Sequence, residues 1–194
     1  MEAETKQLTA GAPGGRALSR GASADEGALV LAARRGEPDA CRILVERHWA
    51  GAWKAALAIT ARTALAEDVV QDAFERAFAA LGRFDETRPF APWLHRIVVN
   101  RALDLVRAER RLVGLDEHTI PAAWIDEAAD QDRPGLEALA RLSPERRAVV
   151  VLRHLLDYSP PEIAQMMELP VGTVNSRLGR ALAELREALE PGDG

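Results

Sequence analysis

Apolar side chains recur every three or four residues in the segment Pro92–Arg111, PWLHRIVVNRALDLVRAERR. This spacing predicts one long amphipathic helix. Its buried stripe would be formed by Leu94, Ile97, Val98, Ala102 and Leu105. The polar side repeats at the same spacing and would present Arg96, Asn100, Asp104, Arg107 and Arg111, flanked by Arg101 and Arg110.

The polar side of this helix has two interpretations. Arginines surrounded by water would make it an ordinary solvated basic face. Alternatively, arginines contact phosphates while asparagine and aspartate hydrogen-bond base edges, which would make the face a nucleic-acid surface. This segment alone leaves both open, so the rest of the chain must distinguish them.

Three further helices are predicted ahead of this one. The first would begin at Ser23, because Ser23 and Glu26 have the spacing of a capping box. The second would begin at Pro38, since proline suits the first position of a helix. The third would span Thr63–Leu81 and end before Gly82. Together with the long helix they form a first, all-helical domain.

One side of the third predicted helix is mostly acidic. It carries Asp68, Gln71, Asp72 and Glu75. This side is either solvated or a docking surface for a basic partner. In the docking interpretation an exposed Phe74 or Phe78 would be the apolar anchor.

The segment between the third helix and the long helix is rich in aromatic residues. Residues Arg83–Pro92 include Phe84 and Phe90 together with two prolines, and Trp93 follows at once. The prolines predict irregular backbone. Aromatic rings beside a basic helix are typical of single-stranded nucleic-acid sites, where bases stack on them. The same rings would equally serve to pin the segment to the core.

Helical periodicity is lost between residues 112 and 134, where the chain becomes acidic. From Leu112 to Ala140 there are seven acids against one cation, Arg133. A stretch of this length and composition is typical of a linker between domains. We therefore expect a disordered tail over residues 1–22, a first domain over 23–111, a linker over 112–134 and a second domain over 135–190.

The second domain has two clear helix starts. Ser143 and Ser159 each precede proline and a nearby glutamate, and Ser159 with Glu162 forms the fuller capping box. A short break at Leu169–Thr173 then separates two helices, which suggests a helix-turn-helix. Thr173, Ser176, Arg177 and Arg180 lie on the polar side of the last helix, where a recognition helix contacts the major groove. The predicted fold class is all-α.

Composition removes several classes of function. The chain has 194 residues, 47% hydrophobic residues and a net charge of −5, which argues against a general nucleic-acid coat. Cys41 is the only cysteine and the four histidines lack metal-ligand spacing, so we expect no disulfide and no metal site. No signal peptide or apolar run of membrane-spanning length is present. We expect a cytoplasmic protein that is not inserted in a membrane.

Three segments together resemble one family. AEDVVQDAFERAFAAL, FAPWLHRIVVNRALDLVRAERR and LSPERRAVVVLRHLLDYSPPEIAQMMELPVGTVNSRLGRALAELR are similar, in this order, to the extracytoplasmic-function group of bacterial RNA polymerase sigma factors. The resemblance covers residues 24–189. It implies a non-catalytic transcription initiation factor without a cofactor, whose partners are core RNA polymerase (its β and β′ subunits), promoter DNA and an anti-sigma factor.

The resemblance also implies roles for individual residues. Asp68, Gln71, Asp72 and Phe74 would dock on the polymerase clamp helices. The −10 element and its melted non-template strand would be bound by Trp93, Arg96, Asn100, Arg101, Asp104, Arg107, Arg110 and Arg111. The −35 element would be bound by Thr173, Asn175, Ser176, Arg177 and Arg180. Asn175 and Gly179 depart from the basic and bulky residues common in the family, so the −35 sequence is not implied.

Two rival functions are less consistent with the sequence. A stand-alone helix-turn-helix repressor would bind an operator without polymerase, but it leaves the acidic side of the third helix and the long basic helix without a role. An enzyme would need a nucleophile with its base, a metal cluster or a phosphate-binding glycine loop, and none is recognisable.

Overall fold

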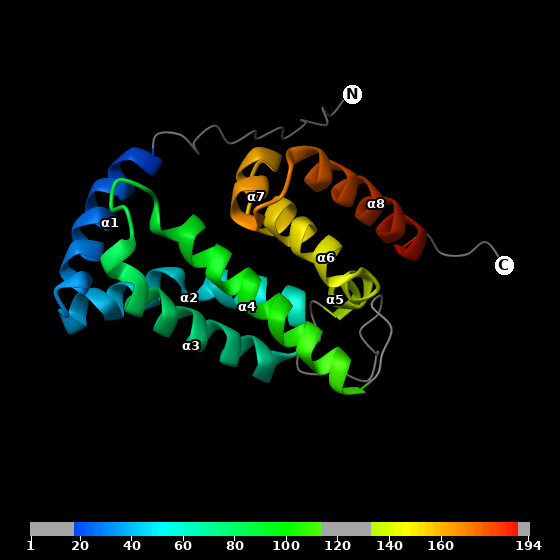
Figure 1. Ribbon diagram of the computed structural model, residues 1–194, viewed down its shortest axis with the longest axis horizontal. Helices are drawn as coiled ribbons and strands as arrows, with labels where there is room; N and C mark the ends of the chain where they lie inside the picture. The colour runs from blue at the N-terminus through cyan, green and yellow to red at the C-terminus, as the bar shows by residue number, and fades with distance from the viewer. Residues whose placement is uncertain (1–17, 114–132, 190–194) are drawn as a thin grey trace, which may run out of the picture.

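The computed structural model describes residues 18–113 and 133–189 (Figure 1). All the regular elements in these two ranges are helices. The first range contains α1 (Leu18–Arg34), α2 (Pro38–Thr60), α3 (Thr63–Ala80), a short 3₁₀ turn (η1, Leu81–Arg83) and α4 (Phe90–Val113). The second contains α5 (Arg133–Ala140), α6 (Pro144–Val150), the π-helical segment η4 (Val151–Leu155), α7 (Pro160–Met167) and α8 (Val171–Leu189). The all-α prediction is confirmed.

Local sequence signals explain most helix boundaries of the first domain. Gly36, in the left-handed region at φ 83°, follows the end of α1, and Pro38 occupies the first turn of α2. Ala61 adopts φ 58° between α2 and α3, and its N–H bonds to the carbonyl of Leu57. Such a short connection makes α2 and α3 antiparallel neighbours, and α4 packs on both.

The start of α1 differs from the prediction. The helix begins at Leu18, inside the segment expected to be a tail, so Ser23 lies within it and is not a cap. The carboxylate of Glu26 bonds instead to His48 and to the backbone of Phe90. The predicted capping box is therefore wrong, because Glu26 has partners from distant parts of the chain.

The second domain follows its predicted starts closely. α6 begins at Pro144 after Ser143, and α7 begins at Pro160 after Ser159. The carboxylate of Glu162 accepts hydrogen bonds from the N–H of Ser159 at 2.7 Å and from its hydroxyl at 2.5 Å, which confirms the capping box. α7 ends at Met167, the next residue Glu168 turns the chain with a φ of 55°, and α8 begins at Val171.

The two domains lie against each other. α6 and α7 contact α4, while α5, α6 and η4 contact α2, and Figure 1 shows α6, α7 and α8 beside the first domain. Buried apolar residues of both domains form one continuous cluster. The expected linker, including a turn predicted near residues 122–129, lies largely outside the described residues. Within the described residues no helix is both long and apolar enough to cross a membrane.

Candidate nucleic-acid interface

The polar side of α4 is exposed at its centre. Asn100 and Asp104, one turn apart, face solvent, as does Arg111 near the end of the helix. The buried stripe predicted for this helix is present: Leu94, Val98 and Ala102 are fully buried, and Ile97 and Leu105 pack against the core. α4 therefore presents hydrogen-bonding side chains from a rigid helix whose other side is held by the core.

Two arginines of this surface are engaged with the second domain. Arg96 forms a salt bridge with Glu168 at the end of α7. Arg107 donates to Glu145 of α6 through Nη2 at 2.7 Å and Nε at 3.1 Å. Although burial raises the pKa of Glu145, its bond to Arg107 and nearby positive charge leave the pKa below its ordinary value. Both arginines of the predicted DNA-binding face are thus paired with glutamates of the second domain.

The remaining two arginines predicted on this face point elsewhere. Arg101 pairs with Asp72 of α3 and is half-buried. Arg110 is buried, with 5% of its surface exposed. Its predicted phosphate contact stays a prediction, and this contact would require the Arg110 guanidinium to become exposed.

The aromatic segment before α4 forms a compact cluster. The ring centroids of Phe84 and Trp93 are 4.7 Å apart, those of Phe90 and Trp93 5.6 Å, and those of Phe84 and Phe90 5.8 Å. Phe84 and Phe90 are buried and pin the segment to the core, whereas Trp93 is only half-buried. The core-pinning interpretation therefore applies to Phe84 and Phe90, and Trp93, which also packs against the core, keeps enough exposed surface for the stacking interpretation to stay a prediction.

A cavity of about 420 Å³ opens beside Trp93. The 83–96 segment contributes one wall, including Arg83, Arg88 and Arg96, and Tyr158 with α7 contributes the other, including Met166. Its lining combines the aromatic surface of Phe84, Trp93 and Tyr158 with the three arginines and with two carboxylates, those of Asp85 and Glu162.

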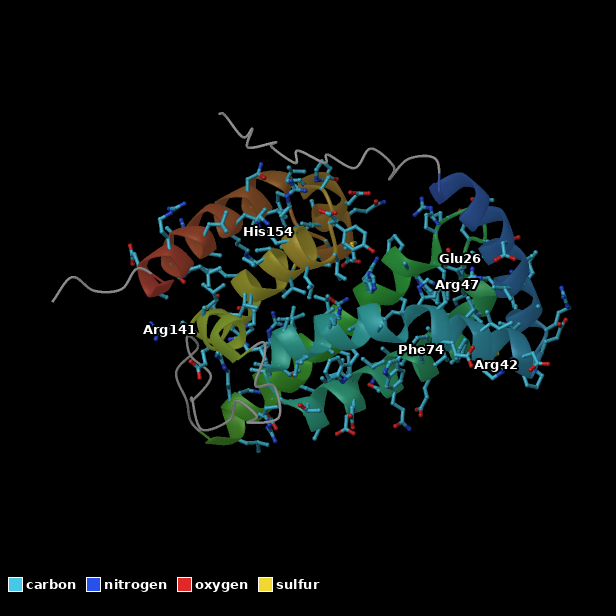
Figure 2. The ribbon with its side chains drawn as sticks, turned by 180° about the vertical axis from the view of Figure 1, so that it is seen from behind. Glu26, Arg42, Arg47, Phe74, Arg141 and His154 are labelled. Atoms are coloured by element: carbon cyan, nitrogen blue, oxygen red, sulfur yellow. The ribbon has the colours of Figure 1, made fainter. Side chains whose placement is uncertain are left out.

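The acidic face of α3 is solvent-accessible at Asp68, Gln71 and Glu75. Asp72 is partly covered, because it pairs with Arg76 at 3.0 Å and also with Arg101. The expectation of an exposed Phe74 is wrong: this ring, labelled in Figure 2, is 4% exposed. It stacks on Trp49 of α2, with the two ring centroids 6.2 Å apart. Phe78, the other ring suggested as the anchor, is half-buried, and Trp49 of α2 is 38% exposed.

The first half of α8 presents the polar residues predicted there. Asn175, Ser176 and Arg180 are exposed, while Thr173 and Arg177 are half-buried. The hydroxyl of Ser176 donates to the carbonyl of Thr173 at 3.0 Å. Val174, Leu178 and Ala181 are buried and hold this helix on the second domain.

Comparison with known proteins agrees with this arrangement. Sigma-70 region 2 matches residues 44–112 and sigma-70 region 4 matches residues 136–185. The chain is 33% identical to the RNA polymerase sigma factor CnrH of Cupriavidus metallidurans, over 84% of this chain and 93% of that protein. It is 36% identical to the ECF RNA polymerase sigma factor SigL of Mycobacterium tuberculosis, over 84% of this chain and 96% of that protein.

The chain belongs to the extracytoplasmic-function (ECF) sigma factors of RNA polymerase. It is a transcription initiation factor that directs the polymerase to promoters. A solved structure of CnrH in complex with the cytosolic domain of CnrY superposes with a TM-score of 0.68 at 32% identity, covering 87% of this chain and 99% of that one. RpoE of Bartonella quintana, at 23% identity and a TM-score of 0.63, shares the fold.

The two domains of this sigma factor are joined by a buried arginine that the sequence analysis missed. Arg147 of α6 is fully buried. It donates to Ile59 O at the end of α2 at 2.5 Å, and to Leu139 O and Ala140 O at the end of α5 at 2.8 and 3.0 Å. It also donates to Leu142 O, just after α5, at 2.9 Å. The last carbonyls of a helix lack partners within it and carry partial negative charge, so one guanidinium stabilises two helix ends.

A second buried polar contact lies between the domains. The hydroxyl of Tyr158 is 2.7 Å from Nδ1 of His95 on α4. Burial is the main cause that lowers the pKa of His95, to about 4, and raises that of Tyr158.

A signal for Arg147 was present in the sequence, because this charged residue lies on the apolar side of its helix with Val150 and Val151.

Proposed function

We propose that this sigma factor captures the melted −10 strand on α4, reads the −35 element with α8 and docks on core RNA polymerase through α3. The observation that carries the proposal is the exposed pair Asn100 and Asp104 on the rigid helix α4, beside the partly exposed ring of Trp93. Amide and carboxylate groups bind base edges, an aromatic ring stacks on an unpaired base, and arginines hold the phosphates around them.

The −10 surface consists of a reduced set of the predicted residues. Trp93, Arg96, Asn100, Asp104, Arg107 and Arg111 are its members. Arg96 and Arg107 exchange Glu168 and Glu145 for phosphates when DNA arrives, and this exchange requires the second domain to move away from α4. Arg101 instead orients Asp72 on the docking face.

The docking surface is the acidic side of α3. Asp68, Gln71 and Glu75 meet a basic surface of the polymerase, with Asp72 held beside them. Trp49 takes the role of apolar anchor that the sequence suggested for Phe74 or Phe78, because Trp49 is the more exposed ring. Within this function the protein catalyses no reaction of its own, and it acts in the cytoplasm, where the polymerase is.

An anti-sigma factor is a further expected partner. Support comes from RpoE of Bartonella quintana, which shares the fold and has been solved in complex with the anti-sigma factor NepR, and from CnrH, which has been solved in complex with the cytosolic domain of CnrY. An inhibitor of this kind would act by covering α4 or α8, because both carry the residues proposed to bind DNA.

Transcription in vitro tests the proposed function. Core polymerase from a related bacterium is mixed with the protein and a template carrying DNA from upstream of its own gene. The Asn100→Ala variant is expected to lower promoter opening at least tenfold, followed by permanganate reactivity of unpaired thymines, while core binding changes less than twofold. Equal loss of opening and core binding would contradict the role of Asn100.

Asn175→Ala is the matched control, since Asn175 is also exposed but lies on α8. It is expected to weaken nuclease protection of the −35 element and to leave opening on a pre-melted −10 template unchanged. If neither the wild-type protein nor its variants gave a transcript, and the protein alone bound duplex operator DNA tightly, the repressor function would be favoured.

A further inference from the structure

The helix α1 lies directly against the segment that leads into α4. A Cβ atom on Gly27 would lie 3.3 Å from the carbonyl oxygen of Glu86, so the two backbones approach closely there. Arg34, at the end of α1, has its Nη1 3.7 Å from the carboxylate of Glu86. α1 precedes the part of the chain matched by sigma-70 region 2, which begins at residue 44, so the family match assigns it no role.

α4 begins without a cap from its own sequence. Pro89 precedes Phe90 and offers no side-chain acceptor, so the first N–H groups of α4 depend on other partners. Glu26 Oε2 accepts the N–H of Phe90 at 3.0 Å, from 64 residues away in the sequence. A carboxylate at this position also meets the positive end of the helix dipole. Glu26 thus supplies from α1 the cap that the local sequence lacks.

His48 of α2 holds the other oxygen of this carboxylate. Its Nε2 lies 2.8 Å from Glu26 Oε1, and both side chains are nearly buried, at 10% and 13% exposure. The His48 ring also contacts Phe90, with centroids 5.2 Å apart. The bond from His48 is the largest cause that lowers the pKa of Glu26, so the carboxylate is ionised at neutral pH. Figure 2 shows Glu26 on α1 beside α2, the helix that carries Arg47.

We propose that Glu26, held by His48, is a positioning residue that sets the start of α4 and thereby the orientation of Trp93 toward the captured −10 strand. Phe90 is fully buried and contacts both Phe84 and Trp93, so a shift of the Phe90 backbone moves the whole aromatic cluster. Trp93 follows Phe90 by one helical turn. This inference rests on the proposed role of α4 in −10 binding, and it adds α1 to the promoter-reading unit.

Strand capture by the holoenzyme tests this inference. The holoenzyme, made with wild-type protein or with Glu26→Ala, is titrated with a fluorescent single-stranded −10 oligonucleotide and with a double-stranded −35 fragment. Glu26→Ala is expected to weaken oligonucleotide binding about tenfold, with core affinity and −35 binding within twofold of wild type. Glu26→Gln keeps an oxygen acceptor for the Phe90 N–H and is expected to recover most of the loss.

Asp25→Asn is the matched control. Asp25 is the adjacent acid, and its carboxylate pairs with Arg47 at 2.9 Å on the exposed side of α1. This variant is expected to bind the oligonucleotide like wild type. If Glu26→Ala behaved like Asp25→Asn, or lost core and −35 binding in parallel, the positioning role would be overturned.

The Asn100→Ala variant separates failure of this inference from failure of the proposed function. Loss of oligonucleotide binding in Asn100→Ala but not in Glu26→Ala would remove only the role of Glu26. Unchanged oligonucleotide binding in both variants would contradict −10 strand capture by α4 as well.

Discussion

The role of each polar residue in this sigma factor depends on whether its side chain is buried and on which groups it contacts. Asn100 and Asp104 stay exposed, as their place on the polar side of α4 predicts. His95 does not: it is 8% exposed and lies against Tyr158 of the second domain. Such a residue titrates differently in the folded and unfolded chain, which makes its effect measurable.

His95 is expected to make folding stability depend on pH. Because burial lowers the pKa of His95 from 6.5 to about 4, the unfolded chain binds the proton first as pH falls. The contribution of His95 to the free energy of unfolding is therefore fully present above about pH 6.5 and is lost progressively between pH 6.5 and about 4. The loss contributes at most about 1.4 kcal/mol per pH unit.

Urea unfolding at several pH values measures this contribution. His95→Phe should remove this part of the pH dependence, whereas His154→Gln, a change at an exposed histidine of η4 (Figure 2), should retain it. Identical pH profiles of wild type and His95→Phe would contradict the prediction.

At the scale of single elements, helix ends were the most predictable features. Proline at the first position, serine with glutamate at the cap and glycine at the end act within a few residues, so their effect is visible in the sequence. α1 and α4 are exceptions, because α1 begins at Leu18 and not at the predicted Ser23, and the cap of α4 comes from Glu26. α6 also continues into a π-helical segment that periodicity does not reveal.

The capping box of α7 is expected to contribute about 1 kcal/mol to the stability of the second domain. Ser159→Ala removes the hydroxyl that bonds to Glu162, so it should lower the free energy of unfolding by that amount. Ser176→Ala is the control, because Ser176 is exposed within α8 and bonds only to the carbonyl of Thr173. Equal effects of the two variants on urea unfolding would exclude a special role for the cap.

At the scale of the whole molecule, the two helical domains are packed against each other through buried contacts and exposed ion pairs. The pairs of Arg96 with Glu168 and Arg107 with Glu145 are solvent-accessible and contribute little energy. Arg147 differs, since its guanidinium is buried and bonds to both domains. We expect Arg147 to make the largest single contribution to the packing of the two domains against each other.

Arg147→Met is expected to destabilise the domain contact by about 2–4 kcal/mol, because carbonyls at two helix ends lose a charged donor. Energy transfer between dyes on Ala79→Cys of α3 and Ala183→Cys of α8, in a Cys41→Ser background, should then fall. Arg153→Met is the control, because Arg153 donates only to Tyr158 O within the second domain. Unchanged transfer in Arg147→Met would contradict a dominant role for this arginine.

The sequence alone determined the helices, most of their boundaries, the family motifs and the main surface candidates on α4 and α8. These features depend on residues three or four positions apart, on caps and on breakers, all of which are local. The tertiary structure decided which of the candidates are accessible: Phe74 and Arg110 are buried, and Arg96 and Arg107 are paired with the second domain. It also decided the roles of Glu26 and Arg147, because their partners lie 64 and 88 residues away and only packing brings them within hydrogen-bonding distance.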